Sequence, residues 1–362
     1  MLNFKAGALR PAGDGACPER FEAANDLVRR TLSQHGLWPE ANGDTAPFSG
    51  LMAGPAGLSV LKERPFTKAR PLRLPEGAAF RNHTHAGRTG SRAYRHYVPA
   101  SAGEGVTGIV MMLHGCTQTP EDFVLGTGMN ALAEAHRLVV IYPEQSRGAN
   151  AQTCWNWFSK GDQRRDRGEP EILAGMARTA MAEHGVPAER VFVAGLSAGA
   201  AMAVILGETY PDIFAAVGAH SGLPFSAAKD VPSAFAAMAG DLTGAAAAPP
   251  AVAALRTIVI HGAADRTVHP SNGAEIVRRA TSGPGLHTMD TTETGTRSGR
   301  GFRRTMSLDA DGQILAEHWL IDGLGHAWSG GNGAGSYADP AGPAASAEMI
   351  RFFLDLPLEG QQ

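Results

Sequence analysis

The chain has 362 residues, of which 43% are hydrophobic and 19% charged, and its formal net charge at pH 7 is −3. This composition is typical of a folded globular protein and excludes a disordered chain. The small net charge gives no reason to expect nucleic acid or an anionic membrane as partner. No apolar run approaches the roughly 20 residues that a helix needs to cross a bilayer, so we expect no membrane span.

The N-terminus lacks the charged start, apolar run and small-residue cleavage site of a secretory signal. We therefore expect a cytoplasmic protein, with an extracellular location as the alternative if the sequence is a trimmed form. The three cysteines, Cys17, Cys116 and Cys154, allow at most one intramolecular disulfide, and their spacing matches no zinc site.

Residues 1–75 differ from the rest and are interpreted as an N-terminal extension, with a catalytic domain at 76–362. Apolar residues over 18–36 recur at helical spacing, and Gly/Pro-rich linkers flank this segment at 41–57 and 64–77. The helix would dock on the catalytic domain or, alternatively, contact a lipid or polymer surface. Its narrow apolar face and few basic residues argue against membrane insertion.

From about residue 90, apolar runs of strand length alternate with helical spacing. The expected strands cover 94–98 (an edge strand), 108–113, 138–142, 191–194, 215–219, 257–260 and 314–321. The expected helices cover 120–136, 171–184, 197–210 and 344–354. This alternation predicts an α/β protein with a mostly parallel sheet flanked by helices on both faces. The alanine-rich span 223–252 is either a helical cap near the site or a surface excursion.

The most specific motif is Gly195-Leu-Ser197-Ala-Gly199, which follows an apolar strand and precedes a helix-forming stretch. This context is that of the nucleophile elbow of the α/β-hydrolase fold. There a strained turn exposes the serine at a helix N-terminus, where amide donors and the helix dipole favour developing negative charge. We therefore expect Ser197 to be a nucleophile.

The partners of such a serine follow it in the order acid, then histidine. Asp265 lies in the loop after the strand 257–260, and its expected role is to orient the imidazole; alternatively it caps a helix that starts near Ser271. His326 lies in a glycine-rich loop after the last strand and is the expected base.

Three other histidines are less suitable as the base. His220 and His261 precede the acid, and His269 is only four residues past it.

An oxyanion hole needs two convergent backbone amides. One is expected from Ala198, which follows the nucleophile, and the other from Cys116, in the loop after the strand 108–113. His114 at the end of that strand either shapes the hole or is a core histidine with satisfied hydrogen bonds.

Several ordered motifs resemble the polyhydroxybutyrate depolymerase family of esterases, which is related to feruloyl and acetylxylan esterases. They are Leu113-His-Gly-Cys-Thr-Gln118, Cys154-Trp-Asn-Trp-Phe158, Gly195-Leu-Ser-Ala-Gly199, Gly325-His-Ala-Trp-Ser-Gly-Gly331 and Tyr337-Ala-Asp-Pro340. The resemblance spans about residues 90–356. It assigns Ser197, Asp265 and His326 to a catalytic triad and places His114 and Cys116 at the oxyanion hole.

The resemblance implies hydrolysis of 3-hydroxybutyrate esters or related short-chain polyesters. Acyl transfer through a serine, a histidine and an acid needs no metal or organic cofactor. The resemblance further implies that Trp155, Trp157 and Trp328 line the substrate cleft, with core packing as the alternative for the first two. Cys116 and Cys154 fall within the matching motifs and are placed for a disulfide near the site, which fits an oxidising compartment.

The chain shows neither the signal peptide nor the C-terminal substrate-binding domain that secreted members of the family usually carry. We therefore expect activity on soluble esters, oligomers or amorphous polymer, and weak adsorption to crystalline polymer. The alternatives are a carbohydrate esterase that cleaves feruloyl or acetyl groups and, more remotely, a non-catalytic granule-binding protein.

Overall fold

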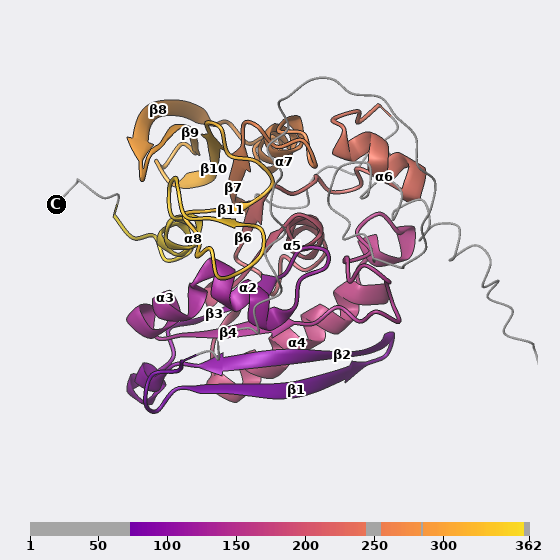
Figure 1. Ribbon diagram of the computed structural model, residues 1–362, viewed down its shortest axis with the longest axis vertical. Coiled ribbons are helices and arrows are strands. Elements are labelled where there is room, and N and C mark those ends of the chain that lie inside the picture. Colours follow the sequence, from indigo (N-terminus) through magenta and orange to yellow (C-terminus); the bar gives the residue numbers. More distant parts are fainter. Residues whose placement is uncertain (1–72, 244–254, 284, 358–362) are drawn as a thin grey trace, which may run out of the picture. The chain divides into compact units, whose positions relative to one another are not determined.

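The computed structural model describes residues 73–243, 255–283 and 285–357 (Figure 1). The predicted helix over 18–36 and most of the predicted linkers lie outside these residues. Ten strands form one sheet in the order β1-β2-β4-β3-β5-β6-β7-β10-β9-β8. The chain therefore has the α/β-hydrolase fold that the motifs predict, with a mainly parallel central sheet.

The centre of the sheet is parallel and its two edges are antiparallel hairpins. The strands are β1 (Ala79–Gly87), β2 (Gly90–Val98), β3 (Gly108–Leu113), β4 (Leu138–Pro143), β5 (Val191–Leu196), β6 (Ala216–His220), β7 (Arg256–Gly262), β8 (Met289–Arg297), β9 (Arg300–Leu308) and β10 (Ile314–Ile321). Strands β4, β3, β5, β6, β7 and β10 run parallel to their neighbours in that order. The hairpins β1–β2 and β8–β9 close the opposite edges. A separate pair of short strands, β11 (Trp328–Ser329) and β12 (Ala338–Asp339), lies after β10.

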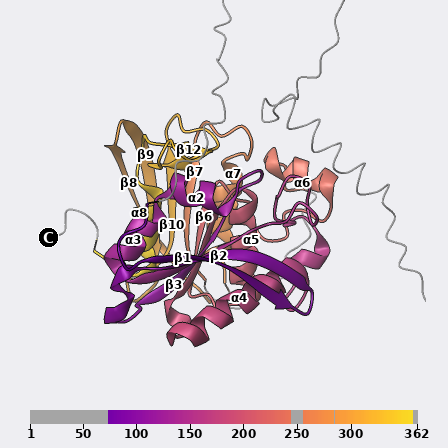
Figure 2. The ribbon, with the colours of Figure 1, turned by 60° about the horizontal axis from the view of Figure 1, so that its bottom comes forward.

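Helices cover both faces of the sheet (Figures 1 and 2). They are α2 (Pro120–Thr127), α3 (Met129–His136), α4 (Gly168–His184), α5 (Ala198–Thr209), α6 (Val231–Met238), α7 (Ser271–Ala280) and α8 (Ala345–Phe353), with 3₁₀ turns at Ala100–Glu104, Lys160–Gln163 and Ala188–Arg190. Helices α4, α5 and α7 pack on one face, and α2, α3 and α8 on the other. None of the helices within the described ranges is long and apolar enough to span a bilayer.

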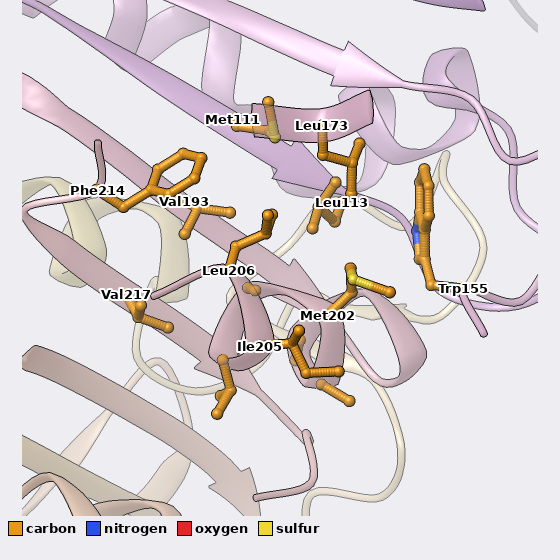
Figure 3. Close-up of a cluster of buried hydrophobic side chains, with 14 of the residues drawn as sticks. Met111, Leu113, Trp155, Leu173, Val193, Met202, Ile205, Leu206, Phe214 and Val217 are labelled. Carbon is orange, nitrogen blue, oxygen red and sulfur yellow. The ribbon is translucent and has the colours of Figure 1, made fainter. Parts of the chain in front are cut away.

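The core consists of two apolar layers because successive residues of each buried strand point to opposite faces. In β3, Met111 and Leu113 join the layer under α4 and α5, whereas Val110 and Met112 join the layer under α2, α3 and α8. Figure 3 shows the first layer, in which Met202 of α5 lies near Leu113 and Trp155. The rigid sheet centre that results carries the loops of the candidate site.

The structure corrects the predicted elements at three places. The strand predicted at 94–98 is part of β2, which is not an edge strand because β1 pairs along its whole length. The helix predicted at 120–136 is two helices, separated by Gly128 in the left-handed conformation (φ 63°). The hairpin β8–β9 was not predicted. Within the alanine-rich span 223–252, α6 is helical, and residues 244–252 lie outside the described part.

Candidate active site

Ser197 occupies a sharp turn between β5 and α5. Its φ of 58° and ψ of −121° are unusual for a residue with a side chain, and its amide donates to the carbonyl oxygen of His220 at 2.9 Å. A Cβ atom at Gly199 would lie 2.1 Å from the carbonyl oxygen of Leu113, and one at Gly195 would lie 2.4 Å from the carbonyl carbon of Gly199. Only glycine fits at these two positions, which explains the spacing of the motif.

Asp265 and His326 meet as the order of the chain predicts. Asp265 follows β7, His326 follows β10, and the His326 Nδ1 lies 2.7 Å from the Asp265 Oδ2. A carboxylate is an acceptor, so Nδ1 carries the proton and Nε2 keeps its lone pair. The Asp265 side chain is fully buried, and its other oxygen accepts the amides of Thr267 and Val268, both at 2.9 Å.

The carboxylate of Asp265 stays ionised despite its burial. Burial alone would raise its pKa, but the hydrogen bonds from His261, His326 and the backbone hold that pKa well below the usual range. The His261 Nε2 lies 2.9 Å from the carbonyl oxygen of Val268 and 3.5 Å from Asp265 Oδ2, so its proton points mainly to the carbonyl. Asp265 does not cap α7, whose N-cap residue is Pro270.

The three residues follow parallel strands of one sheet, at the same edge of that sheet. Ser197, Asp265 and His326 follow β5, β7 and β10, and the spatial order of these strands is β5-β6-β7-β10. The carboxyl ends of parallel strands form the edge at which open α/β sheets bind ligands. His220 lies at the end of β6, between β5 and β7, and is buried with a partner at each ring nitrogen.

His220 links the serine turn to the histidine loop. Its carbonyl accepts the Ser197 amide, and its Nε2 accepts the amide of Ser329, three residues past His326, at 3.0 Å. Its ring stacks on Trp328 with centroids 5.0 Å apart. Burial lowers the pKa of His220 to about 3, so the ring is neutral and its hydrogen bonds are fixed.

The loop after β3 carries the predicted second oxyanion donor. Gln118 is buried; its Oε1 accepts the Gly115 amide at 2.9 Å, and its Nε2 donates to the carbonyl oxygen of Ser336 at 3.0 Å. A disulfide joins Cys116 to Cys154, and the Thr117 amide donates to the carbonyl oxygen of Gln152 at 2.7 Å. The position of this loop is therefore fixed by the contacts of Gln118 and by the bonds to the segment 152–154.

His114 lies beneath this loop and has both ring nitrogens engaged. Nδ1 lies 2.8 Å from the carbonyl oxygen of Gly115, and Nε2 accepts the amide of Gln145 at 3.1 Å. Burial lowers the pKa of His114 to about 4, so the ring is neutral. His114 thus shapes the loop through its backbone partners, and neither nitrogen is available to bind an oxyanion.

The tryptophans do not line a cleft as the resemblance implies. Trp155 and Trp328 are 0% and 1% exposed, and Trp157 is also buried. The indole of Trp155 donates to the carbonyl oxygen of His114, and that of Trp328 donates to the Ser346 hydroxyl, both at 3.1 Å. Both rings therefore support the site from within the core.

Sequence reasoning missed a buried polar network under the Cys154 segment. Gln145 donates to the carbonyl oxygen of Cys154 at 2.9 Å and to the carboxylate of Glu169. Glu169 also accepts the amide of Asn156 at 2.8 Å and lies 3.3 Å from Arg92, while burial raises its pKa. Isolated Gln and Glu residues carry no sequence signal that would reveal such contacts.

The chain is similar in sequence to known esterases over a region that includes Ser197 and Asp265. The family described as esterase PHB depolymerase matches residues 92–294. The poly(3-hydroxyalkanoate) depolymerase C of Paucimonas lemoignei is 35% identical over 228 residues, which are 60% of this chain and 54% of that protein. A probable acetylxylan esterase A of Aspergillus flavus is 30% identical over 248 residues, 64% of this chain and 78% of that protein.

Among solved structures, the acetyl xylan esterase of Aspergillus awamori has a TM-score of 0.54 and 21% identity, covering 68% of this chain and 94% of its own. This likeness concerns the fold. The family match extends over more than half of the sequence, so the chain belongs to the esterase PHB depolymerase family. It spans about half the length of the Paucimonas lemoignei depolymerase.

Proposed function

We propose that the protein is a carboxylic ester hydrolase that cleaves short-chain polyester bonds, with 3-hydroxybutyrate oligomers as substrates. The observation that carries this proposal is the contact between Asp265 and His326, made at the sheet edge where Ser197 occupies a nucleophile elbow. Membership of the family and the likeness to a poly(3-hydroxyalkanoate) depolymerase support the choice of substrate.

In the acylation step, His326 Nε2 takes the hydroxyl proton of Ser197 while the serine oxygen bonds to the ester carbonyl carbon. The amides of Ala198 and Cys116 then donate to the oxyanion. Ala198 is the first residue of α5, where amide groups have no partner within the helix. The tetrahedral intermediate collapses when the protonated His326 gives its proton to the departing alkoxide, which leaves as an alcohol.

In the deacylation step, His326 takes a proton from water, whose oxygen attacks the acyl-enzyme carbonyl. Collapse returns the proton to Ser197 and releases the carboxylic acid. Asp265 holds the imidazole in the required tautomer and stabilises the imidazolium in both steps. Its buried, multiply hydrogen-bonded carboxylate suits this role because it stays ionised.

The alternative function is that of a carbohydrate esterase that removes acetyl or feruloyl groups. The similarity to a probable acetylxylan esterase A, of which the match covers 78%, favours this alternative. Both functions use the same acyl chemistry, and they differ only in the alcohol and acyl groups that the site accepts. The buried tryptophans do not discriminate between them.

The disulfide near the site bears on the compartment in which the protein works. We infer that Cys116 and Cys154 are bridged in a protein that works in an oxidising compartment, which favours the extracellular alternative.

The test compares hydrolysis of a 3-hydroxybutyrate trimer, methyl ferulate and an acetylated xylo-oligosaccharide by the wild-type protein and by Ser197→Ala. We expect the highest kcat/KM on the trimer and a loss on the order of 10⁶-fold in the variant, by the precedent of a serine protease. The matched control is Ser282→Ala, which removes an exposed hydroxyl at the end of α7 and should leave turnover unchanged.

If the trimer is untouched and an acetyl or feruloyl ester is cleaved in a Ser197-dependent way, the carbohydrate esterase replaces the polyesterase. If no ester is cleaved by the wild-type protein, the proposal of an enzyme is wrong.

A further inference from the structure

A second cluster of chemically active side chains lies where α4 packs against the β1–β2 hairpin. His184 is the last residue of α4, Glu183 precedes it, and His96 lies on β2. Their possible ligand atoms all lie within 4.8 Å of one another. Strands β4 and β3 separate β2, which carries His96, from β5, which leads into Ser197.

The distance between the two imidazoles fits a shared metal ion. The His184 Nε2 and His96 Nε2 are 3.2 Å apart. Two nitrogens bound to one tetrahedral zinc ion at 2.0–2.1 Å are separated by about 3.3 Å. The Glu183 carboxylate lies 3.8 Å from the His184 Nε2 and 4.0 Å from the His96 Nδ1. Its side chain is half exposed, and one of its oxygens lies within 4.8 Å of a ligand nitrogen of each imidazole.

Burial favours metal binding at these imidazoles. His96 is 3% exposed and His184 13%. The His83 ring lies 5.3 Å from the His96 ring, and its buried Nε2 has no hydrogen-bond partner among the described residues.

We propose that His96, His184 and Glu183 bind one divalent transition-metal ion, for which Zn²⁺ is the appropriate probe. Two imidazoles and a carboxylate are donors that zinc accepts, whereas Ca²⁺ and Mg²⁺ prefer oxygen ligands. The ion cross-links the end of α4 to β2 and thereby stabilises the antiparallel edge of the sheet. It takes no part in ester hydrolysis because strands β4 and β3 separate β2 from β5, which leads into Ser197.

The experiment titrates Zn²⁺ into the full chain after removal of metals by a chelator and measures bound metal and thermal unfolding. We expect one ion per wild-type chain at this site and a rise in the unfolding temperature when the ion is added. His184→Gln and Glu183→Gln should each weaken binding by at least about 10-fold and reduce the thermal shift, with esterase turnover unchanged. Co²⁺ should give the visible absorption of a tetrahedral ion in the wild type and not in His184→Gln.

The matched control is His136→Gln, which removes the histidine that ends α3 in the same way that His184 ends α4. This control should bind Zn²⁺ like the wild type. The proposal is overturned if the wild type binds no ion at about 0.1 mM free Zn²⁺. It is also overturned if His184→Gln and Glu183→Gln bind as tightly as the wild type, which would leave the two imidazoles sharing a hydrogen bond only.

Discussion

At the scale of single residues, the chemistry of the site depends on backbone positions that few residue types can occupy. Ser197 adopts a positive φ, and the two glycines around it lie where any side chain would collide with the backbone. These constraints are local, so the motif predicts the turn from the sequence alone. The order of the chain then points to Asp265 and His326, which the structure brings into contact.

Single-residue contacts also explain why the orientation of the tryptophan side chains could not be predicted from the sequence. The indole partners are the carbonyl oxygen of His114 for Trp155 and the hydroxyl of Ser346 for Trp328. An indole near a catalytic motif in the sequence can face either the cleft or the core. Which of the two it faces depends on a hydrogen-bond partner that is distant in the sequence. Gln118 is a similar case, because its amide bonds to the carbonyl of Ser336, 218 residues away.

Asp265→Asn tests the role of the buried carboxylate. The amide can present a donor to Nδ1 and favour the wrong tautomer of His326, so kcat should fall by about 10⁴-fold with the fold retained, as in a serine protease. Steady-state kinetics on a soluble ester measure the loss, and circular dichroism checks the fold. Asp311→Asn, in the turn between β9 and β10, is the control and should keep full activity. A loss below about tenfold in Asp265→Asn would contradict the assignment.

At the scale of elements, buried strands and helices were predictable, and exposed hairpins were not. The predicted strands 108–113 and 314–321 coincide with β3 and β10. In β3 a continuous apolar run marks a buried parallel strand. Strand β8 is largely exposed along its length, so its threonine-rich sequence lacks the alternation that marks a half-buried strand. Gly128 splits one helical pattern into two helices, which periodicity alone does not reveal.

At the scale of elements, the disulfide joins the loop after β3 to the segment that contains Cys154. Cys116 and Cys154 are 38 residues apart, and closing a loop of that length stabilises the fold by about 4 kcal/mol in the chain-entropy model. Cys154→Ser should therefore lower the free energy of unfolding by about 2–4 kcal/mol and reduce kcat, because Cys116 carries a proposed oxyanion donor. Denaturant titration and ester turnover measure the two effects.

Cys17→Ser is the matched control, since it removes the cysteine that is not in this disulfide. It should change neither stability nor turnover. Equal unfolding midpoints for Cys154→Ser and the wild-type protein would show that the bridge does not constrain the fold.

At the scale of the whole molecule, several buried histidines couple stability to pH. Burial lowers the pKa of His114 and His318 to about 4 and that of His220 to about 3, from an ordinary value of 6.5. Between these values and 6.5 the unfolded chain binds more protons than the folded chain. Folding stability due to these groups is thus fully present above pH 6.5 and is lost as the pH falls through this window. The lowered pKa of Asp265 acts only below its ordinary value of 3.8.

We therefore expect the free energy of unfolding to fall between pH 6.5 and about 4, by up to about 1.4 kcal/mol per pH unit for each such histidine. Denaturant unfolding at several pH values gives this slope. His318→Gln should make the slope shallower by about one proton, because it removes one of these buried imidazoles. The His318 Nε2 has no hydrogen-bond partner in the described part of the chain, so the substitution breaks no hydrogen bond of that nitrogen there. A free energy that stays constant from pH 7 to 4.5 would be incompatible with neutral buried histidines.

The central claim is that Ser197 is the nucleophile of an esterase, and covalent labelling tests it most directly. The protein is treated with a fluorophosphonate that phosphonylates activated serines, and the labelled peptide is identified by mass spectrometry. We predict one adduct per chain, on Ser197, together with complete loss of ester turnover and no labelling of Ser197→Ala. An adduct on another serine that accompanies the loss of activity, or full activity without any adduct on Ser197, would contradict the proposed mechanism.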